Sequence, residues 1–388
     1  MKVLYASDDL GPHDQRLLGA VAAGPDREVH LLTFYNRSAR LPDWLGQECP
    51  NVTVHHQRFP AYPEVPSRSG RLLTALVRRR DERRYLASFA AALREIRPDV
   101  LHVGWAQTTG YAAALSGFHP TVLTPWGSDI LVWPRASRRD REKARRALRH
   151  ADAVACDAEA VRRRIVEIAG LDPARIAVFP WGVDLERFRP SSSNLLRARL
   201  GWGDDPIVVM TRQMREVYGV LEFAKGFARV RARAFGARLL LVGDGHLRAQ
   251  VEAALQPLGP CWHTAGAVEN ARMAEFLQAG DVYASFSTSD GTSVSLLEAF
   301  ACGLPAVVTD LEANREWVKD GENGFLVPTG DMEAMADRLG RILGDPALRK
   351  RMGERCLAIA RERADWRRNA QIMLGCYASA ARMTYPRR

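Results

Sequence analysis

The sequence is poor in cysteine and has no long apolar run. Its six cysteines are scattered over 388 residues without a Cys-x-x-Cys pair or a nearby Cys/His quartet, so neither a disulfide framework nor a zinc site is expected. No apolar run reaches the roughly 18–20 residues that a membrane-spanning helix needs. Asp8 and Asp9 also interrupt the N-terminal apolar stretch too early for a secretion signal. We therefore expect a cytoplasmic protein, which could work at the cytoplasmic face of a membrane.

Neither disorder, collagen nor a coiled coil fits the composition, which is 47% hydrophobic and 26% charged. The chain is too long for one compact core and predicts two domains. Its net charge is +10, and residues 78–84 and 135–149 are especially basic. Two interpretations stay open for these segments. They bind an anionic partner (nucleic acid, acidic lipid or a phosphate-bearing substrate), or they form ordinary solvated helix faces.

Short apolar runs alternate with helical stretches such as 85–96, 158–169 and 247–255 along the whole chain. Because the expected strands are apolar on both faces, they indicate parallel sheets covered by helices, and the fold class is α/β. The expected strands are residues 2–6, 28–33, 52–56, 100–103, 121–124, 153–156 and 176–179 in the first half, and 206–211, 238–242, 262–265, 282–285, 306–309 and 324–327 in the second.

A polar joint rich in proline and serine at residues 189–194 divides this pattern into similar halves. We predict two Rossmann-like domains that face each other across a cleft, where ligands bind beyond the carboxyl ends of the strands. The expected boundaries are a first, acceptor-side domain at 1–190, a linker at 191–205, a donor domain at 206–365 and a C-terminal helix at 366–388. That helix could cross back to the first domain.

The segment from Ser285 to Pro305 holds the richest set of polar side chains. A strand is expected to end near Ser285 and a helix to begin near Thr292, with Asp290 before the helix and Glu298 roughly 12 Å further along its axis. A helix N-terminus holds phosphate, and the two acids could bind hydroxyls on either side of a diphosphate. Alternatively, Asp290 is a helix cap and Glu298 a buried packing residue, and the spacing alone favours neither.

The same segment resembles the E-x7-E signature of glycosyltransferase family 4, which are retaining enzymes of the GT-B fold. Here the pattern reads Asp290-x7-Glu298. Residues 124–129 (Thr-Pro-Trp-Gly-Ser-Asp) resemble the family's T-x-H-G-S-D loop, and 179–190 its P-N-G-V-D-x-x-x-F-x-P element. The resemblance covers about residues 1–380. It implies that a sugar moves from a nucleoside-diphosphate donor to a hydroxyl acceptor with its anomeric configuration retained.

The resemblance also implies a donor site, with catalysis assigned to Arg212, Asp290 and Glu298. Glu298 is expected to hold the ribose, Asp290 the transferred sugar and Arg212 the diphosphate, which suits a planar guanidinium. The family's lysine is absent before Gly219, and Arg215 could replace its charge. Backbone groups complete the expected site: the N–H groups of Gly291, Thr292 and Ser293 toward the diphosphate, and the loop from Gly266 to Val268 toward the nucleobase.

In the first domain this sequence departs from the family pattern. The family's glycine pair is reduced to Gly11, and its loop histidine is Trp126, which could stack on a sugar. Asp129 could bind hydroxyls of donor or acceptor, or it could cap the following turn. The contacts on this side of the ligand are therefore the least defined by the sequence.

No cofactor is expected besides the nucleotide sugar as co-substrate, and no D-x-D pair stands at a strand end, so we expect no metal requirement. The expected acceptor is a glycan, a lipid-linked sugar or a small glycoside, and the basic first half could contact an anionic membrane. Two alternatives remain: an epimerase or hydrolase of nucleotide sugars on the same fold, and a nucleic-acid-binding protein. The second is disfavoured because aromatic-interleaved Arg/Lys motifs are missing, and we expect no nucleic acid partner.

Overall fold

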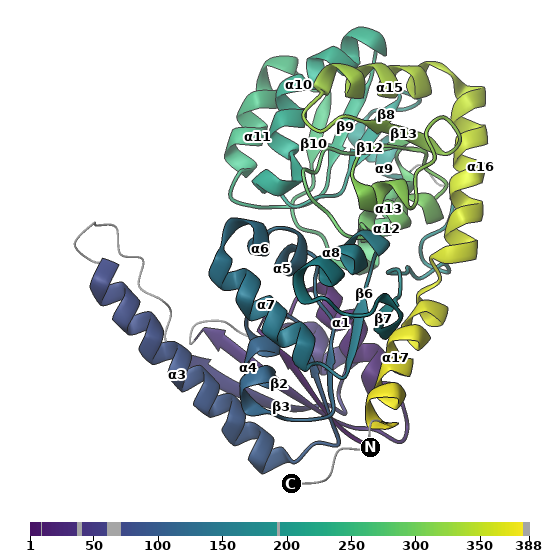
Figure 1. Cartoon of the computed structure of the whole chain (residues 1–388). Coiled ribbons are helices and arrows are strands. Elements are labelled where there is room, and N and C mark those ends of the chain that lie inside the picture. The colour runs from purple at the N-terminus through teal and green to yellow at the C-terminus, as the bar shows by residue number, and fades with distance from the viewer. Residues whose placement is uncertain (9, 37–40, 60–70, 192–194, 383–388) are drawn as a thin grey trace. The chain divides into compact units, whose positions relative to one another are not determined.

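The computed structural model describes the chain except residues 9, 37–40, 60–70, 192–194 and 383–388. The chain divides into two compact units (Figure 1). The first unit comprises Met1–Cys156, Val161–Phe179 and Ala370–Arg388, and the second comprises Asp157–Ala160 and Pro180–Asn369. The units are therefore not contiguous in sequence, because a short segment after residue 156 belongs to the second unit and the C-terminal segment belongs to the first.

The first unit is built on a seven-stranded sheet in which every paired neighbour is parallel. The strand order is β3-β2-β1-β4-β5-β6-β7, so the order reverses between β1 and β4. Its strands are β1 (Lys2–Ser7), β2 (Glu28–Asn36), β3 (Thr53–Phe59), β4 (Val100–Val103), β5 (Thr121–Leu123), β6 (Ala153–Cys156) and β7 (Ile176–Val178). Its helices are α1 (Pro12–Ala22), α2 (Asp43–Glu48), α3 (Arg71–Ile96), α4 (Thr109–Ser116), α5 (Ser128–Leu131), α6 (Trp133–Ala136), α7 (Arg138–His150) and most of α8 (Glu159–Ala169).

The second unit contains a six-stranded parallel sheet in the order β10-β9-β8-β11-β12-β13, which reverses between β8 and β11. Its strands are β8 (Ile207–Met210), β9 (Arg238–Leu241), β10 (Trp262–Thr264), β11 (Val282–Ser285), β12 (Ala306–Thr309) and β13 (Gly324–Val327). Its helices are α9 (Leu195–Leu200), α10 (Val220–Arg233), α11 (Arg248–Leu255), α12 (Asn270–Gln278), α13 (Val294–Ala301), α14 (Glu312–Arg315), α15 (Met332–Gly344) and α16 (Pro346–Arg363).

The last helix, α17 (Trp366–Arg382), begins in the second unit and continues in the first. Its buried Tyr377 hydroxyl lies 2.6 Å from Nδ1 of His102 on β4, and Nε2 of that ring lies 2.9 Å from the Thr124 hydroxyl. Burial lowers the pKa of His102 to about 3, so the imidazole is neutral and donates one of these bonds while it accepts the other. The C-terminal helix, which the sequence left free to cross back to the first domain, does belong to the first unit from Ala370 onward.

The core explains the architecture. All residues of the central strands β4, β6, β8, β11 and β12 are buried, as parallel strands covered on both faces must be. In the second unit, α10 buries Phe223 and Phe227 in a cluster with Leu339 of α15. Each such side chain contributes roughly 1.5–3 kcal/mol by leaving water. No helix among the described residues is long and apolar enough to cross a membrane.

All thirteen expected strands are present, and no strand end differs from the expected one by more than three residues. The helix expected at 85–96 is the last part of α3, which has 26 residues. The helix expected to begin near Thr292 begins at Val294 instead, with Ser293 as its N-cap residue. That difference of two residues changes which backbone N–H groups belong to the helix terminus.

Candidate active site

The loops after β8 and β11 meet where the second sheet reverses its strand order. The Thr288 N–H donates a hydrogen bond to the Val217 carbonyl at 2.8 Å. Gly219 has a φ of 61°, and a Cβ there would lie 2.2 Å from the Phe286 carbonyl oxygen. Only glycine permits both this backbone conformation and this approach. The two loops are therefore held together at the position where open α/β sheets bind ligands.

The loops after β9 and β10 join the same edge of the sheet. The Gly243 N–H donates to the Gly266 carbonyl at 2.8 Å, and a Cβ on Gly243 would lie 2.3 Å from the Arg212 carbonyl oxygen. The Gly243-Asp-Gly245 sequence thus allows two loops to cross at close distance. Gly266 and the half-buried Val268, expected to meet the nucleobase, lie in the loop after β10.

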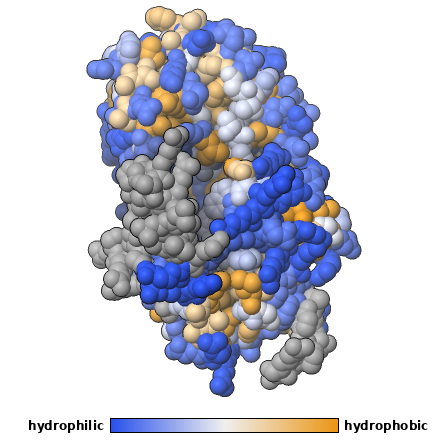
Figure 2. Space-filling model, turned by 60° about the vertical axis from the view of Figure 1, so that its left-hand side comes forward, coloured by the Kyte–Doolittle hydropathy of each residue, from blue (hydrophilic) through white to orange (hydrophobic). Residues whose placement is uncertain are grey.

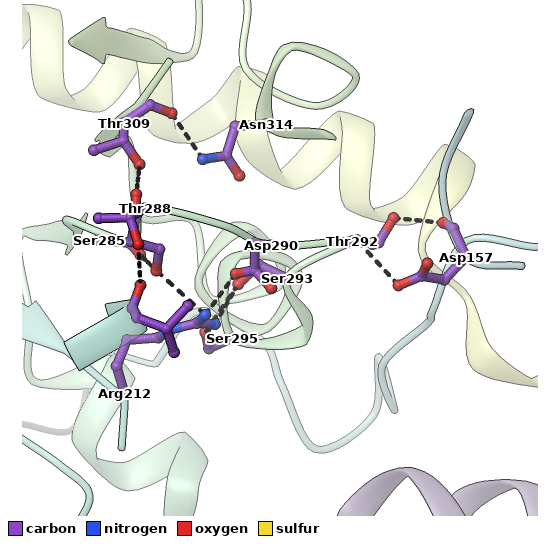
Figure 3. A network of polar contacts seen from close by, with 12 residues as sticks. Asp157, Arg212, Ser285, Thr288, Asp290, Thr292, Ser293, Ser295, Thr309 and Asn314 are labelled. Carbon is purple, nitrogen blue, oxygen red and sulfur yellow. Dashed lines mark hydrogen bonds and ion pairs between the residues drawn. The ribbon is translucent and has the colours of Figure 1, made fainter. Parts of the chain in front are cut away.

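Arg212 lies at the centre of a polar cluster formed by the loops after β8 and β11 and the start of α13 (Figure 3). Its Nη2 donates to Asp290 Oδ2 at 2.5 Å and to the Ser287 hydroxyl at 3.3 Å. Its Nη1 donates to the hydroxyls of Ser293 at 2.8 Å and Ser295 at 3.2 Å. The Arg212 side chain is 9% exposed and that of Asp290 19%. The structure therefore brings together Arg212, Asp290 and Ser293, three of the predicted donor-site residues.

The electrostatics of the pair are coupled. Burial raises the pKa of Asp290, while Arg212 and the Gly291 N–H act in the opposite direction. Burial acts to lower the pKa of Arg212, but Asp290, Tyr283 and Tyr218 raise it overall, so the guanidinium is always charged. The Arg212 guanidinium lies 4.1 Å from the centre of the Tyr218 ring. Its Nε is buried and has no hydrogen-bond partner within the part of the chain that the structure describes.

The predicted phosphate-binding N–H groups are not all directed the same way. Gly291 faces the Asp290 carboxyl, and the Thr292 N–H donates to Oδ2 of Asp157 at 3.0 Å. Ser293 is the cap residue of α13. Asp157 was not singled out from the sequence. The one available signal was its place directly after the buried strand β6, the edge at which parallel sheets carry their polar residues.

Glu298 and Arg215 occupy different environments. Glu298 is 5% exposed on α13. Burial raises the pKa of Cys302 to about 12, and the nearby charge of Glu298 adds to this effect. Arg215 is exposed and begins the short 3₁₀ helix Glu216–Tyr218, where its carbonyl accepts the Tyr218 N–H. Ser287 and Ser295, which the sequence did not assign, bring two further hydroxyl groups to Arg212. Their signal was the unusual density of serine between 285 and 295.

In the first unit, Gly11 precedes α1 and Trp126 stacks on His13 with ring centres 5.7 Å apart. Asp129 is fully buried, and its two carboxyl oxygens accept the N–H groups of Trp126 and Ala106, each at 3.0 Å. Burial raises the pKa of Asp129 to about 7, against the effect of these backbone donors. The carboxylate thus binds backbone groups that precede it in the chain, and α5 has no side-chain cap hydrogen bond, so this geometry does not show Asp129 as a cap of the following turn. Among the described residues, no group of three or more His, Cys, Asp or Glu side chains is placed to hold a metal ion.

Solved structures define the class of the fold. HepE from Anabaena, crystallised with UDP, has 21% sequence identity over 98% of this chain and 100% of its own, with a TM-score of 0.76. Sucrose-phosphate synthase from Thermosynechococcus elongatus has 19% identity over 97% of this chain and 98% of its own, with a TM-score of 0.77. The protein therefore has the two-domain GT-B fold.

Sequence comparisons point to one class of protein. The model of Glycosyltransferase Family 4 matches residues 27–187, and the model of Glycosyl transferases group 1 matches residues 205–345. Each half of the chain therefore matches a model of glycosyltransferases. A D-inositol 3-phosphate glycosyltransferase of Acidothermus cellulolyticus is 32% identical over 62% of this chain and 57% of its own length. The putative glycosyltransferase EpsD of Bacillus subtilis is 30% identical over 45% and 46%. The matches thus span about half the length of these relatives.

Proposed function

We propose that the protein transfers a sugar from a nucleoside-diphosphate donor to an acceptor hydroxyl with retention of the anomeric configuration. The observation that carries this proposal is the Arg212–Asp290 pair, surrounded by serine hydroxyls, at the reversal point of the second sheet. Both residues lie inside the part of the chain that matches the glycosyl transferase group 1 model. A fixed cation beside sugar-binding groups is what departure of a diphosphate requires.

In the proposed donor complex, Arg212 holds the diphosphate and Glu298 the ribose hydroxyls. The unpaired Nε of Arg212 offers a donor that no described residue uses. Asp290 accepts hydroxyls of the transferred sugar. The Ser293 backbone, the loop from Gly266 to Val268 and the charge of Arg215 stay assigned to the donor as predicted from the sequence, whereas the N–H groups of Gly291 and Thr292 face Asp290 and Asp157.

The proposed reaction proceeds on one face of the sugar. The bond between the anomeric carbon and the diphosphate oxygen breaks, and the acceptor oxygen forms its bond to the same carbon from the same side. The acceptor proton passes to the departing phosphate oxygen. Arg212 and the start of α13 stabilise the negative charge that develops on the diphosphate. Asp290 is held by a guanidinium, which makes its carboxylate a weak nucleophile and supports a route without a covalent intermediate.

Support for an anionic acceptor or an anionic membrane surface comes from the first unit. A pocket of about 630 Å³ lies between α3 and α7, with Tyr111 of α4 at its wall. Glu82 binds both Arg139 and Lys143, at 2.8 and 2.6 Å. The pocket has a net positive charge, because four basic side chains and two acidic ones line it. The basic residues are Arg83, Arg139, Lys143 and Arg146, and the acidic residues are Glu82 and Glu142. Of the basic segment 78–84, the side chains of residues 78 and 79 lie outside the described part.

Two further observations support this assignment of the acceptor. Similar proteins include a D-inositol 3-phosphate glycosyltransferase and a phosphatidyl-myo-inositol mannosyltransferase, and both names specify substrates that carry phosphate. Apolar patches are small and scattered on the face shown in Figure 2. Contact of that face with a membrane would thus rest on charge and weaken with salt.

The donor is tested by thermal shift with UDP-, GDP-, ADP- and TDP-sugars, beginning with UDP-glucose because HepE was crystallised with it. We expect one nucleotide class to raise the melting temperature, and silence across all four would contradict the proposal. Release of free sugar or of an epimer from the donor alone would favour the alternative of an epimerase or hydrolase.

The membrane contact is tested by flotation with vesicles that contain or lack acidic lipid. We expect R83E/R146E to lose binding to acidic vesicles, whereas R351E/R361E, an equal charge change on exposed residues of α16, keeps it. Equal recovery of the wild type in the soluble fraction with both vesicle types would end this part of the proposal.

A further inference from the structure

Asp157 makes two hydrogen bonds to one residue of the donor loop. Its carboxylate Oδ2 accepts the Thr292 N–H at 3.0 Å, and its main-chain carbonyl accepts the Thr292 hydroxyl at 2.5 Å (Figure 3). Asp157 is 6% exposed and Thr292 4%. Both residues belong to the second unit, although they are 135 positions apart in sequence. One side chain and one carbonyl thus fix both the backbone and the side chain of Thr292.

The same carboxylate packs directly against Gly291. A Cβ at residue 291 would lie 2.6 Å from Oδ2 and 3.0 Å from Oδ1 of Asp157, so no side chain fits there without displacing the carboxylate. Gly291 and Thr292 stand between Asp290 and Ser293, the two residues of this turn that contact Arg212. The position of Asp157 therefore determines the path of the backbone between the two Arg212 partners.

This arrangement is unfavourable by itself. Oδ1 of Asp157 is buried and has no hydrogen-bond partner among the described residues. Burial, opposed by the Thr292 N–H and reinforced by the nearby acids Asp290 and Glu316, raises the pKa of Asp157 to about 7. A buried carboxyl with an unsatisfied oxygen beside two other acids does not stabilise the fold by itself. The close packing of Asp157 on Gly291 therefore indicates a role in setting the backbone conformation of the donor loop.

We propose that Asp157 is a positioning residue of the donor site, which acts through Gly291 and Thr292 to hold Asp290 and Ser293 against Arg212. The inference rests on the proposed function, because it assigns the loop after β11 to the diphosphate end of the donor. Asp157 does not touch the donor itself. Its loss therefore changes nucleotide affinity by releasing the turn.

The test compares D157A, D157N and T292V by calorimetry with UDP, and with GDP, ADP and TDP where UDP does not bind. We expect D157A to weaken binding about tenfold, the effect of one charge-assisted hydrogen bond. D157N keeps an oxygen that can accept the Thr292 N–H and should recover most of the affinity. T292V loses only the hydroxyl bond and should lie between them. If D157A does not fold, the last two variants still decide, because unchanged affinity in T292V contradicts the inference.

The matched control is D345A. Asp345 caps α16 by accepting the Leu348 N–H at 2.9 Å, so its removal deletes a similar bond elsewhere in the same unit. We expect D345A to lower the melting temperature and keep wild-type nucleotide affinity. Wild-type affinity in D157A would make Asp157 merely structural and overturn the inference while leaving the proposed function intact. A wild-type protein that binds no nucleoside diphosphate would overturn the proposed function first.

Discussion

The guanidinium of Arg212 and the carboxylate of Asp290 lie 2.5 Å apart, although the two residues are 78 positions apart in the chain. Arg212 follows β8 and Asp290 follows β11, the two strands between which the second sheet reverses its order. Parallel strands end at the same edge, so this topology places the two side chains together. Because both are largely buried, each group depends on the other for its charge to be tolerated.

Arg212→Ala is expected to lose both stability and activity. It leaves Asp290 buried without its partner, which costs about 3 kcal/mol of unfolding free energy, and it removes the cation that faces the diphosphate, which lowers turnover by about 10²-fold or more. Arg212→Lys keeps the charge but not the planar fork, so it should restore stability more than turnover. Denaturant unfolding and initial rates measure the two effects. Full activity in the alanine variant would show that the donor lies elsewhere.

Glu298→Gln is expected to weaken binding of a nucleoside diphosphate and leave the affinity for inorganic pyrophosphate unchanged, because the proposed role of Glu298 is to hold ribose hydroxyls. Glu222→Gln, an exposed position on α10, is the matched control and should bind both ligands normally. Calorimetry with the two ligands separates the effects. An equal loss of affinity for both would place Glu298 at the phosphates or in the fold instead.

Gly219→Ala is expected to separate the loops after β8 and β11. The added Cβ would meet the Phe286 carbonyl at 2.2 Å in a backbone with positive φ, whereas Gly201 has a φ of 67° and open space around it. Gly201→Ala should therefore lower the free energy of unfolding only by the backbone strain of roughly 1–2 kcal/mol. Gly219→Ala should lower it by more than that and should also abolish nucleotide binding. Thermal unfolding and calorimetry compare them. Equal stability losses would mean that the loop contact yields easily.

Asp129 is expected to make stability depend on pH. Burial raises its pKa in the folded protein from 3.8 to about 7, so the neutral form contributes up to roughly 4 kcal/mol that is lost as pH rises from 4 through 7. Asp129→Asn cannot ionise and lacks this dependence. The melting temperature of the wild type should exceed that of the variant most at low pH, and the difference should shrink toward pH 8. A difference that stays constant would mean that Asp129 is ionised throughout.

Turnover is expected to withstand excess EDTA, because the proposed charge at the diphosphate comes from Arg212 and the start of α13. The measurement compares initial rates after chelation and after addition of Mg²⁺ or Mn²⁺. A rate that collapses with EDTA and returns with either ion would contradict metal-independent transfer.

The sequence predicted the sheets well because buried parallel strands need continuous apolar runs. Short apolar runs such as 100–103 and 306–309 fit no other structural element. It also predicted that Asp290 and Glu298 flank a helix start, since both lie within one local segment. It did not predict that Asp157 would take the Thr292 N–H, because that contact joins residues 135 positions apart and leaves no periodic trace. The position of the C-terminal helix was open for the same reason, and Tyr377 beside His102 decided it.

The location of α17 also bears on how the polypeptide acquires its structure as it leaves the ribosome. Most of the first unit is synthesised before residue 180, but Tyr377, which covers His102, is made after almost all of the second unit. During the translation of some 190 further residues, the nascent N-terminal sheet therefore lacks Tyr377, and His102 is not covered by it. The unit that begins first is completed last.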